Sequence, residues 1–290
     1  MRKMQFLFRA NNSNLLTMTI PSHYAYNNLY EAILNALSNA GVPANKVTRK
    51  DITAIDEFHV RGQQVSLELA AAAGLQPGMH ILDAGCGLGG TCRLLADEFD
   101  CDVTGIDITE DYIRTAGRLS ELTGLQHKTR FVHGSVLSLP FEKNSFDVVF
   151  TEHVQMNIAD KKTFYAEIAR VLKNNGRFVY YDILSNDHLP VQYPVPWAPD
   201  ESISFLITGQ QLHALLKEAG FNNIQITNET AKGIAFFNNL FNRIEQKGLP
   251  PLGLHMLVGL DKMRNLHSNL IEGRVVLESG ICIPSHSLSN

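Results

Sequence analysis

Short apolar runs alternate with longer segments of helical periodicity through the middle of the 290-residue chain. The short runs predict strands at 80–84, 102–107, 130–133, 147–150 and 177–184. Apolar residues at helical spacing predict helices between them, at 90–99, 110–123 and 160–172. This alternation favours an α/β fold with a parallel sheet and helices on both faces. Ligands of such sheets bind beyond the carboxyl ends of the strands, so the residues there are the candidates for a site.

The N-terminal part of the chain does not share this alternation. Helical patterns at 24–40 and 63–73 precede the first strand, and we expect the polar segment at 47–55 between them to be a loop. Two helices in this position favour a lid over the strand ends. We therefore expect residues 1–59 to form an N-terminal extension and helical lid.

The remaining residues, 60–290, are expected to form one large domain with two covering segments. The first cover is the aromatic, proline-rich loop at 185–207, and the second is a helical insertion at 230–272. We expect the aromatic stripe in that insertion, which includes Phe236 and Phe237, to belong to the core or to cover a pocket. Further strands are expected at 223–227 and 274–283.

The first predicted strand ends in a glycine-rich turn with Gly85, Gly87 and Gly89 at alternate positions. Glycine lets a ligand approach the bare backbone, and the amides of the following helix favour polar or anionic groups. Asp107 ends the second strand about twenty residues later, where an acid commonly binds a pair of ribose hydroxyls. The turn therefore predicts a site for an adenosine-containing cofactor. Because Gly85, Gly87 and Gly90 also fit the dinucleotide pattern, a nicotinamide cofactor and a turn without a ligand remain alternatives.

Composition narrows the class of partner. The formal net charge is −4 with no long basic run, which argues against nucleic acid as the main partner. The four cysteines are Cys86, Cys92, Cys101 and Cys282. They form no C-x-x-C pattern and have no histidines at zinc spacing, so we expect a reducing compartment and no metal site.

No stretch of the sequence is long and apolar enough to span a membrane. We expect a cytoplasmic protein, with a mitochondrial-type transit peptide as the alternative, because residues 1–30 carry basic but no acidic side chains.

Several segments, in a fixed order, resemble the class I S-adenosylmethionine-dependent methyltransferases. They lie at 82–90 (LDAGCGLGG), 105–107 (GID), 139–141 (LPF), 145–149 (SFDVV), 167–173 (EIARVLK) and 215–221 (LLKEAGF). Within that superfamily the chain is similar to the small-molecule branch, which includes sarcosine/dimethylglycine, phosphoethanolamine and tocopherol methyltransferases. The segments that carry this second likeness lie at 56–62 (DEFHVRG), 153–158 (HVQMNI) and 194–197 (PVPW).

The resemblance implies a doubly wound, Rossmann-like sheet of seven strands, mostly parallel with the last strand antiparallel. It also implies S-adenosylmethionine as the cofactor, S-adenosylhomocysteine as the product, and a small-molecule acceptor bound by a monomer or homodimer. The residues expected to hold the cofactor are Asp83, Gly85, Cys86, Gly87, Gly89, Asp107, Ile108, Ser135, Val136 and Thr151. Ser135 stands where the family often has an aspartate for the adenine amine, and its hydroxyl can still accept that hydrogen bond.

The acceptor side of the site is expected to contain His153, Glu152 and His59. A neutral amine needs little proton handling before it attacks the methyl group, whereas a hydroxyl or an acidic carbon needs a general base. His153 follows the fourth strand and is the best-placed base, with a role in the wall as the alternative. Glu152 can bind a cationic amine or anchor its loop. His59 can face the methionine end of the cofactor or the acceptor, or it can pack before a helix.

Four aromatic residues, Tyr24, Tyr26, Tyr193 and Trp197, can form a lid over the acceptor. Aromatic faces suit a cationic amine, and they also suit a flat apolar molecule. We therefore expect methyl transfer from S-adenosylmethionine to a small molecule, with an amine favoured over a hydroxyl or a carbon. The alternatives are an NAD-type oxidoreductase and a catalytically silent protein that binds S-adenosylmethionine.

Overall fold

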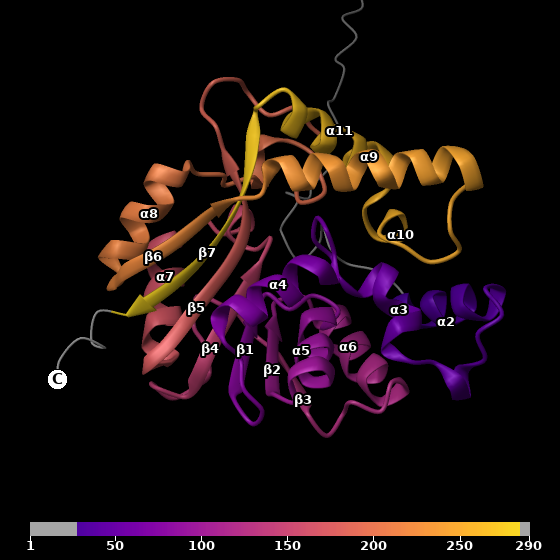
Figure 1. Ribbon diagram of the computed structural model, residues 1–290, viewed down its shortest axis with the longest axis horizontal. Coiled ribbons are helices and arrows are strands. Elements are labelled where there is room, and N and C mark those ends of the chain that lie inside the picture. The colour runs from indigo at the N-terminus through magenta and orange to yellow at the C-terminus, as the bar shows by residue number, and fades with distance from the viewer. Residues whose placement is uncertain (1–27, 285–290) are drawn as a thin grey trace, which may run out of the picture.

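The structure is a computed structural model that describes residues 28–284. Its centre is a seven-stranded sheet in the order β3-β2-β1-β4-β5-β7-β6 (Figure 1). The strands are β1 (His80–Ala84), β2 (Asp102–Asp107), β3 (Thr129–His133), β4 (Phe146–Glu152), β5 (Leu172–Ser185), β6 (Phe221–Asn228) and β7 (Val275–Pro284). The strands from β3 to β5 pair in parallel, and β7 pairs antiparallel with both β5 and β6. The predicted mostly parallel sheet with an antiparallel last strand is confirmed.

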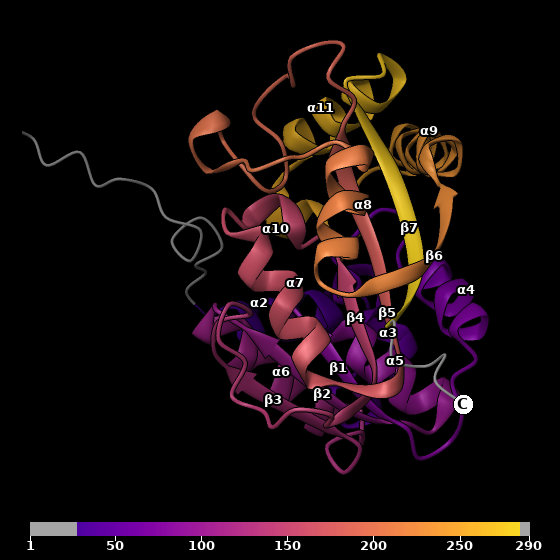
Figure 2. The same cartoon turned by 90° about the vertical axis from the view of Figure 1, so that its left-hand side faces the viewer.

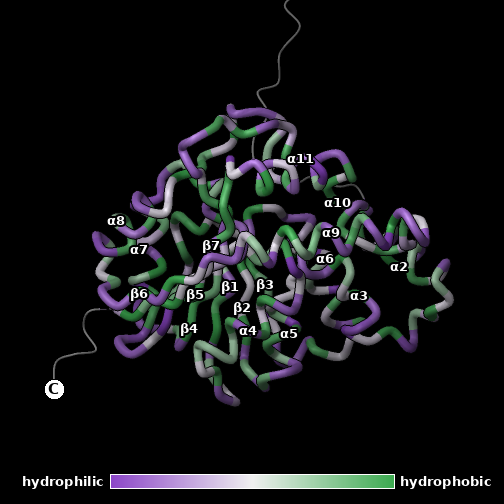
Figure 3. The backbone as a smooth tube through the Cα atoms, turned by 45° about the horizontal axis from the view of Figure 1, so that its top comes forward, coloured by the Kyte–Doolittle hydropathy of each residue, from purple (hydrophilic) through white to green (hydrophobic). Residues whose placement is uncertain are grey.

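The central strands send alternate side chains into two separate hydrophobic cores, because successive residues of a strand point to opposite faces. Ile81 and Val148 pack on one face, and their neighbours Leu82 and Val149 pack on the other. Helices α4 (Gln63–Ala73), α5 (Gly90–Phe99) and α6 (Glu110–Leu122) cover the first face; α7 (Lys161–Val171) and α8 (Gly209–Glu218) cover the second (Figure 2). Figure 3 shows that hydrophobic stretches gather in the interior and hydrophilic ones along the periphery. Burial on both faces explains why these strands have continuous apolar sequences.

The expectation of a loop at 47–55 is wrong. The helices before the sheet are α2 (Leu29–Asn39), α3 (Arg49–Asp56) and α4. The carboxylate of Asp51 accepts hydrogen bonds from the backbone N–H (2.8 Å) and the hydroxyl (2.6 Å) of Thr48, which caps α3. Ile52 and Ile55 are buried. Two apolar residues in so short a helix give little periodicity, so the sequence pattern did not reveal it. Residues 24–27 of the first predicted helix lie outside the described residues.

Three helices lie over the carboxyl ends of the strands: α9 (Thr230–Lys247), α10 (His255–Val258) and α11 (Leu260–Ile271) (Figure 1). The ring of Phe237 on α9 stacks on Phe241, with centroids 5.8 Å apart, and packs against His267 of α11 at 5.5 Å. The aromatic stripe thus joins the two helices. The boundary between lid and domain at residues 59 and 60 stays a prediction. Within residues 28–284, none of the helices has the length and hydropathy needed to cross a membrane.

Candidate functional site

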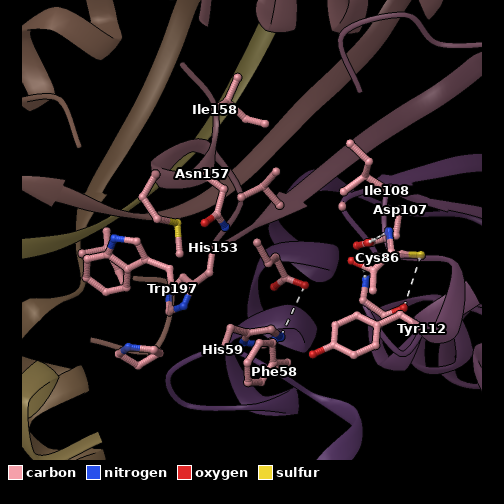
Figure 4. Close-up of a pocket in the computed structure, with 18 of the residues that line it drawn as sticks. Phe58, His59, Cys86, Asp107, Ile108, Tyr112, His153, Asn157, Ile158 and Trp197 are labelled. Carbon is pink, nitrogen blue, oxygen red and sulfur yellow. Dashed lines mark hydrogen bonds and ion pairs between the residues drawn. The ribbon is translucent and has the colours of Figure 1, made fainter. Parts of the chain in front are cut away.

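A cavity of about 470 Å³ lies between the carboxyl ends of the parallel strands and the covering helices α9–α11. Figure 4 shows Cys86, Asp107 and Ile108 on one side of this cavity and Trp197 on the opposite side, with His59 between them. The cavity therefore connects the glycine turn after β1 with the helical cover.

The glycine turn forms one end of the cavity, which is lined by Asp83, Gly85, Cys86 and Gly87. Gly85 has a φ of +91°, and a Cβ atom there would meet the side chain of Val154 at 2.5 Å, so glycine is required. Gly87 has a φ of +51°, and apart from Gly87 itself and its two chain neighbours no atom of the described residues lies within 4 Å of its Cβ position. At Gly87 the bare backbone therefore adjoins open space that a ligand can fill.

Two residues expected to hold the cofactor, Gly89 and Thr151, are not among the described residues that line the cavity. Gly89 precedes α5 with a φ of +77°, and a Cβ atom there would meet the ring of Phe131 at 2.4 Å. Thr151 is fully buried in β4. The structure gives both residues a place in the packing behind the cavity wall, and their contact with a cofactor stays a prediction.

Asp107 at the end of β2 shapes the turn and also lines the cavity. Its carboxylate accepts hydrogen bonds from the backbone N–H groups of Gly87 (3.0 Å) and Thr109 (2.8 Å). The next residue, Ile108, is 45% exposed although it is large and apolar. The same end of the cavity is lined by Ser135 and Val136. A carboxylate beside an uncovered apolar side chain suits a ligand that has both hydroxyl groups and a flat apolar face.

The centre of the cavity wall contains His59, Asp83 and Glu152, and the buried Glu57, which is not among the described lining residues, contacts His59; we call these four residues the acid–histidine cluster. The Nε2 atom of His59 lies 3.2 Å from the carboxylate of Glu57 and 3.5 Å from that of Glu152. Ser66 on α4 donates a hydrogen bond of 2.8 Å to Glu152. Burial, reinforced by Glu152, raises the pKa of Asp83 to about 8. Sequence reasoning gave Glu57 no role of its own; its one signal was its place in the 56–62 segment, two residues before His59.

The two histidines of the site have opposite pKa shifts. Burial lowers the pKa of His59, but the carboxylates of Glu152 and Glu57 outweigh burial and raise it to about 9. Burial and the neighbouring charge of His59 hold the pKa of His153 well below its ordinary 6.5. The two rings lie 6.0 Å apart, and the Nε2 atom of His153 has no hydrogen-bond partner among the described residues. At neutral pH the site therefore combines a protonated His59 with a neutral His153.

These shifts predict how stability depends on pH. Folded His59 keeps its proton up to about pH 9, whereas the unfolded chain loses it near 6.5, so this contribution is present below pH 6.5 and is lost as the pH rises through 9. We expect the free energy of unfolding of wild type to fall more steeply between pH 6.5 and 9 than that of His59→Gln, as measured by urea denaturation. The exposed His127→Gln variant should follow wild type, and equal slopes for all three proteins would contradict the shift.

His59 lies on the segment that joins α3 to α4, residues 56–62, which we call the strap. One end of the strap is fixed by a buried ion pair in which Asp56 accepts hydrogen bonds from two nitrogen atoms of Arg93 on α5. Arg93 is fully buried and also donates to the carbonyl oxygens of Leu88 in the glycine turn and Ala116 on α6. This arginine therefore links the strap, the turn and two helices.

The other end of the strap is fixed to the helical cover. Arg61 donates hydrogen bonds to Glu229 (2.9 Å), which directly precedes α9, and to Glu68 (2.6 Å) on α4. Both Arg61 and Glu229 are buried. Sequence reasoning assigned no role to either residue. With both ends held by ion pairs, the strap keeps His59 against Glu152.

The loop after β4 carries His153 and is fixed by hydrogen bonds to the side chains of Asp182 and Lys161. Asp182 on β5 accepts hydrogen bonds from the backbone N–H groups of Val154 (2.9 Å) and Gln155 (3.3 Å). The ammonium group of Lys161, which is buried, donates to the carbonyl oxygens of Gln155 (3.0 Å) and Ile158 (2.6 Å). Burial lowers the pKa of Lys161 to about 8. Asp182 and Lys161 thus determine the path of the loop.

The rest of the cavity is apolar and lies beneath the cover; we call it the apolar chamber. Its wall includes Trp197, Phe236, Phe237, Val258, Met263 and Leu266. The indole N–H of Trp197 donates a hydrogen bond of 2.9 Å to Ser204, so the polar edge of this ring has a partner in the protein. Of the expected aromatic lid, Trp197 lines the cavity, whereas Tyr193 is not among the described lining residues and Tyr24 and Tyr26 lie outside residues 28–284. The sequence signal for the chamber was the aromatic stripe of α9.

Comparison with known proteins places this arrangement in context. A family model described as a methyltransferase domain matches residues 75–220. A sterol 24-C-methyltransferase of Gibberella zeae is 40% identical over 119 residues, which cover 41% of this chain and 31% of the length of that relative. One similar solved structure is phosphoethanolamine N-methyltransferase 2 of Haemonchus contortus in complex with S-adenosyl-L-methionine. It superposes with a TM-score of 0.68 and is 19% identical in sequence; the match covers 87% of this chain and 60% of that one. A [4+2]-cyclase, SpnF, superposes with a TM-score of 0.64 at 18% identity over 92% of this chain and 97% of its own. At these identities the two structures show a shared fold.

Proposed function

Because this chain belongs to the methyltransferase-domain family, we propose that it transfers a methyl group from S-adenosylmethionine to a small-molecule acceptor and releases S-adenosylhomocysteine. The observation that carries the proposal is the continuous cavity, which runs from the glycine turn and Asp107 past His153 to the apolar chamber. The similar sterol methyltransferase acts on a small molecule, which supports an acceptor of that kind. That relative matches over less than a third of its length, so the acceptor is argued from the cavity.

The residues at the glycine-turn end fit an adenosine-containing methyl donor. The open space at Gly87 leaves backbone accessible to a ligand, and the Asp107 carboxylate at the strand end suits a ribose hydroxyl pair. The exposed side chain of Ile108 suits one face of an adenine ring. Bound S-adenosylmethionine supplies a methyl group that is already activated on a sulfonium, so positioning accounts for much of the catalysis. We propose that this end of the cavity holds the donor and that Asp83 lies at its methionine end.

We propose that His153 acts as the general base toward the acceptor. Its imidazole is neutral at physiological pH because its pKa lies well below 6.5, and it lines the cavity. A base in this state can take a proton from a hydroxyl or an acidic carbon. Glu152 is occupied by His59 and Ser66, which leaves it less available to a cationic amine. The sequence favoured an amine acceptor, whereas these contacts favour a hydroxyl or carbon acceptor.

Calorimetry with the full-length protein tests the proposed cofactor. We expect S-adenosylhomocysteine to bind and NAD not to compete. Asp107→Ala should weaken S-adenosylhomocysteine binding roughly 10- to 100-fold, since hydrogen bonds to a charged group are lost. Asp102→Ala, at the opposite end of the same strand and exposed, is the matched control and should bind like wild type.

Two other outcomes of that experiment would change the assignment. Binding of NAD without S-adenosylhomocysteine would replace the proposal with an oxidoreductase. Binding of S-adenosylhomocysteine without product release from any alcohol, phenol, amine or carbon acid in a screen would favour a protein that binds the cofactor without methyl transfer. The fold similarity to a cyclase makes this second alternative worth testing.

A further inference from the structure

The cavity wall has an unusual charge distribution. Among the described residues, no lysine or arginine lines the cavity. The nearby basic groups already have partners: Arg93 with Asp56, Arg61 with Glu229, and Lys161 with backbone carbonyl oxygens. Protonated His59 also lines the cavity, but its charge is already balanced by the carboxylates of Glu57 and Glu152. A carboxylate, phosphate or diphosphate on the acceptor would therefore be buried without a cation free to pair with it, which is strongly unfavourable.

The carboxylates of the wall are also engaged. Asp56 pairs with Arg93, and Asp107 accepts two backbone hydrogen bonds. Asp83 accepts a hydrogen bond from the thiol of Cys92, and Asp160 accepts two from Thr163 at the start of α7. Glu152 accepts hydrogen bonds from Ser66 and Thr91 and lies next to protonated His59. The apolar chamber itself is bounded by side chains such as Phe236, Val258 and Leu266 from the covering helices. A cationic group in the chamber would thus meet apolar side chains and find no carboxylate free to pair with it.

We propose that the acceptor is an uncharged, largely apolar molecule. Its apolar body occupies the chamber beneath α9–α11, and one hydroxyl or acidic carbon at its inner end faces the side chain of His153, which lines the cavity. This inference rests on the proposed function and assigns the acceptor class for the same site. The geometry agrees with the class, since His153 lines the same cavity as the apolar side chains of the chamber.

Competitive binding of small probes tests this acceptor class. The full-length protein is first saturated with S-adenosylhomocysteine and then titrated with Nile red, an uncharged dye that fluoresces in apolar sites. Four competitors, each with ten carbon atoms in an unbranched chain, are compared at neutral pH: decanol, decanoate, decyl phosphate and decylammonium. We expect decanol to displace the dye at a concentration at least about tenfold lower than each charged competitor, because a charge would be buried without a partner.

A matched pair of variants shows whether the chamber is the binding site. Phe236→Lys adds a cation at a half-buried position of the wall and should improve displacement by decanoate about tenfold relative to wild type, since the carboxylate then has a partner. Leu240→Lys adds the same charge one turn later on α9, at a half-buried position that is not among the lining residues, and should leave the order of the competitors unchanged.

The outcomes separate the acceptor class from the proposed function. Failure of S-adenosylhomocysteine to bind would contradict the proposed function. If S-adenosylhomocysteine binds but Nile red does not, or if charged competitors match decanol, the uncharged acceptor is ruled out while the methyl donor site stands. Equal effects of Phe236→Lys and Leu240→Lys would likewise rule out the chamber as the place where the acceptor binds.

Discussion

Replacing His153 with asparagine is expected to lower kcat for a hydroxyl or carbon acceptor by about 10²–10⁴, the usual contribution of a general base. Asparagine is the appropriate replacement because His153 has a φ of +56°, a left-handed conformation that asparagine adopts more readily than most residues. The amide cannot take up a proton. We expect binding of S-adenosylhomocysteine to be nearly unchanged, since the donor end of the cavity is formed by the glycine turn. Product release measured at saturating acceptor, together with calorimetry, checks both parts.

Two controls separate a base from a residue of the cavity wall. Exogenous imidazole should restore part of the activity of His153→Ala, which a packing defect would not allow. His127→Asn, an exposed histidine far from the site, should have wild-type kcat. If His153→Asn retains kcat with its acceptor, His153 belongs to the wall and an amine acceptor, which needs little proton handling, is favoured instead.

The sequence predicted the parts of this protein that follow from local patterns. Strands buried on both faces gave short apolar runs, as at Ile81 and Leu82, which enter different cores. The glycine turn was recognisable because positive φ angles at Gly85 and Gly87 require glycine. Asp107 was recognisable from its distance along the chain from that turn. These features gave the fold and the position of the site, whereas the roles of the site residues stay predictions.

Other parts depend on contacts between residues far apart in the sequence. Asp56 and Arg93 are separated by 37 residues, and Arg61 and Glu229 by 168, so no local pattern reports either ion pair. The charge state of His59 depends on Glu152, which the fold brings to it from the end of β4. The role of the covering helices α9–α11 could not be predicted from a local pattern either. An apolar helix face can pack in a core or line a cavity, and the sequence does not distinguish the two.

The ion pair at the first end of the strap predicts a large loss of stability. Asp56→Ala is expected to lower the free energy of unfolding by about 3–5 kcal/mol, because it leaves the fully buried guanidinium of Arg93 without its carboxylate. Urea denaturation at neutral pH measures the loss. The control is Lys162→Ala, which breaks the exposed ion pair with Glu218 and should cost no more than about 1 kcal/mol. Equal losses in the two variants would show that Arg93 finds other partners or water.

A double-mutant cycle distinguishes the ion pair from general damage to the core. Asp56→Leu combined with Arg93→Met removes both charges and keeps apolar volume, so the double variant should be more stable than either single variant. Even so, the double variant should bind S-adenosylhomocysteine more weakly than wild type, because Arg93 also donates to the Leu88 carbonyl oxygen in the glycine turn. Recovered stability without recovered binding would mean that the buried arginine positions the turn. Recovery of both would limit the ion pair to holding the strap.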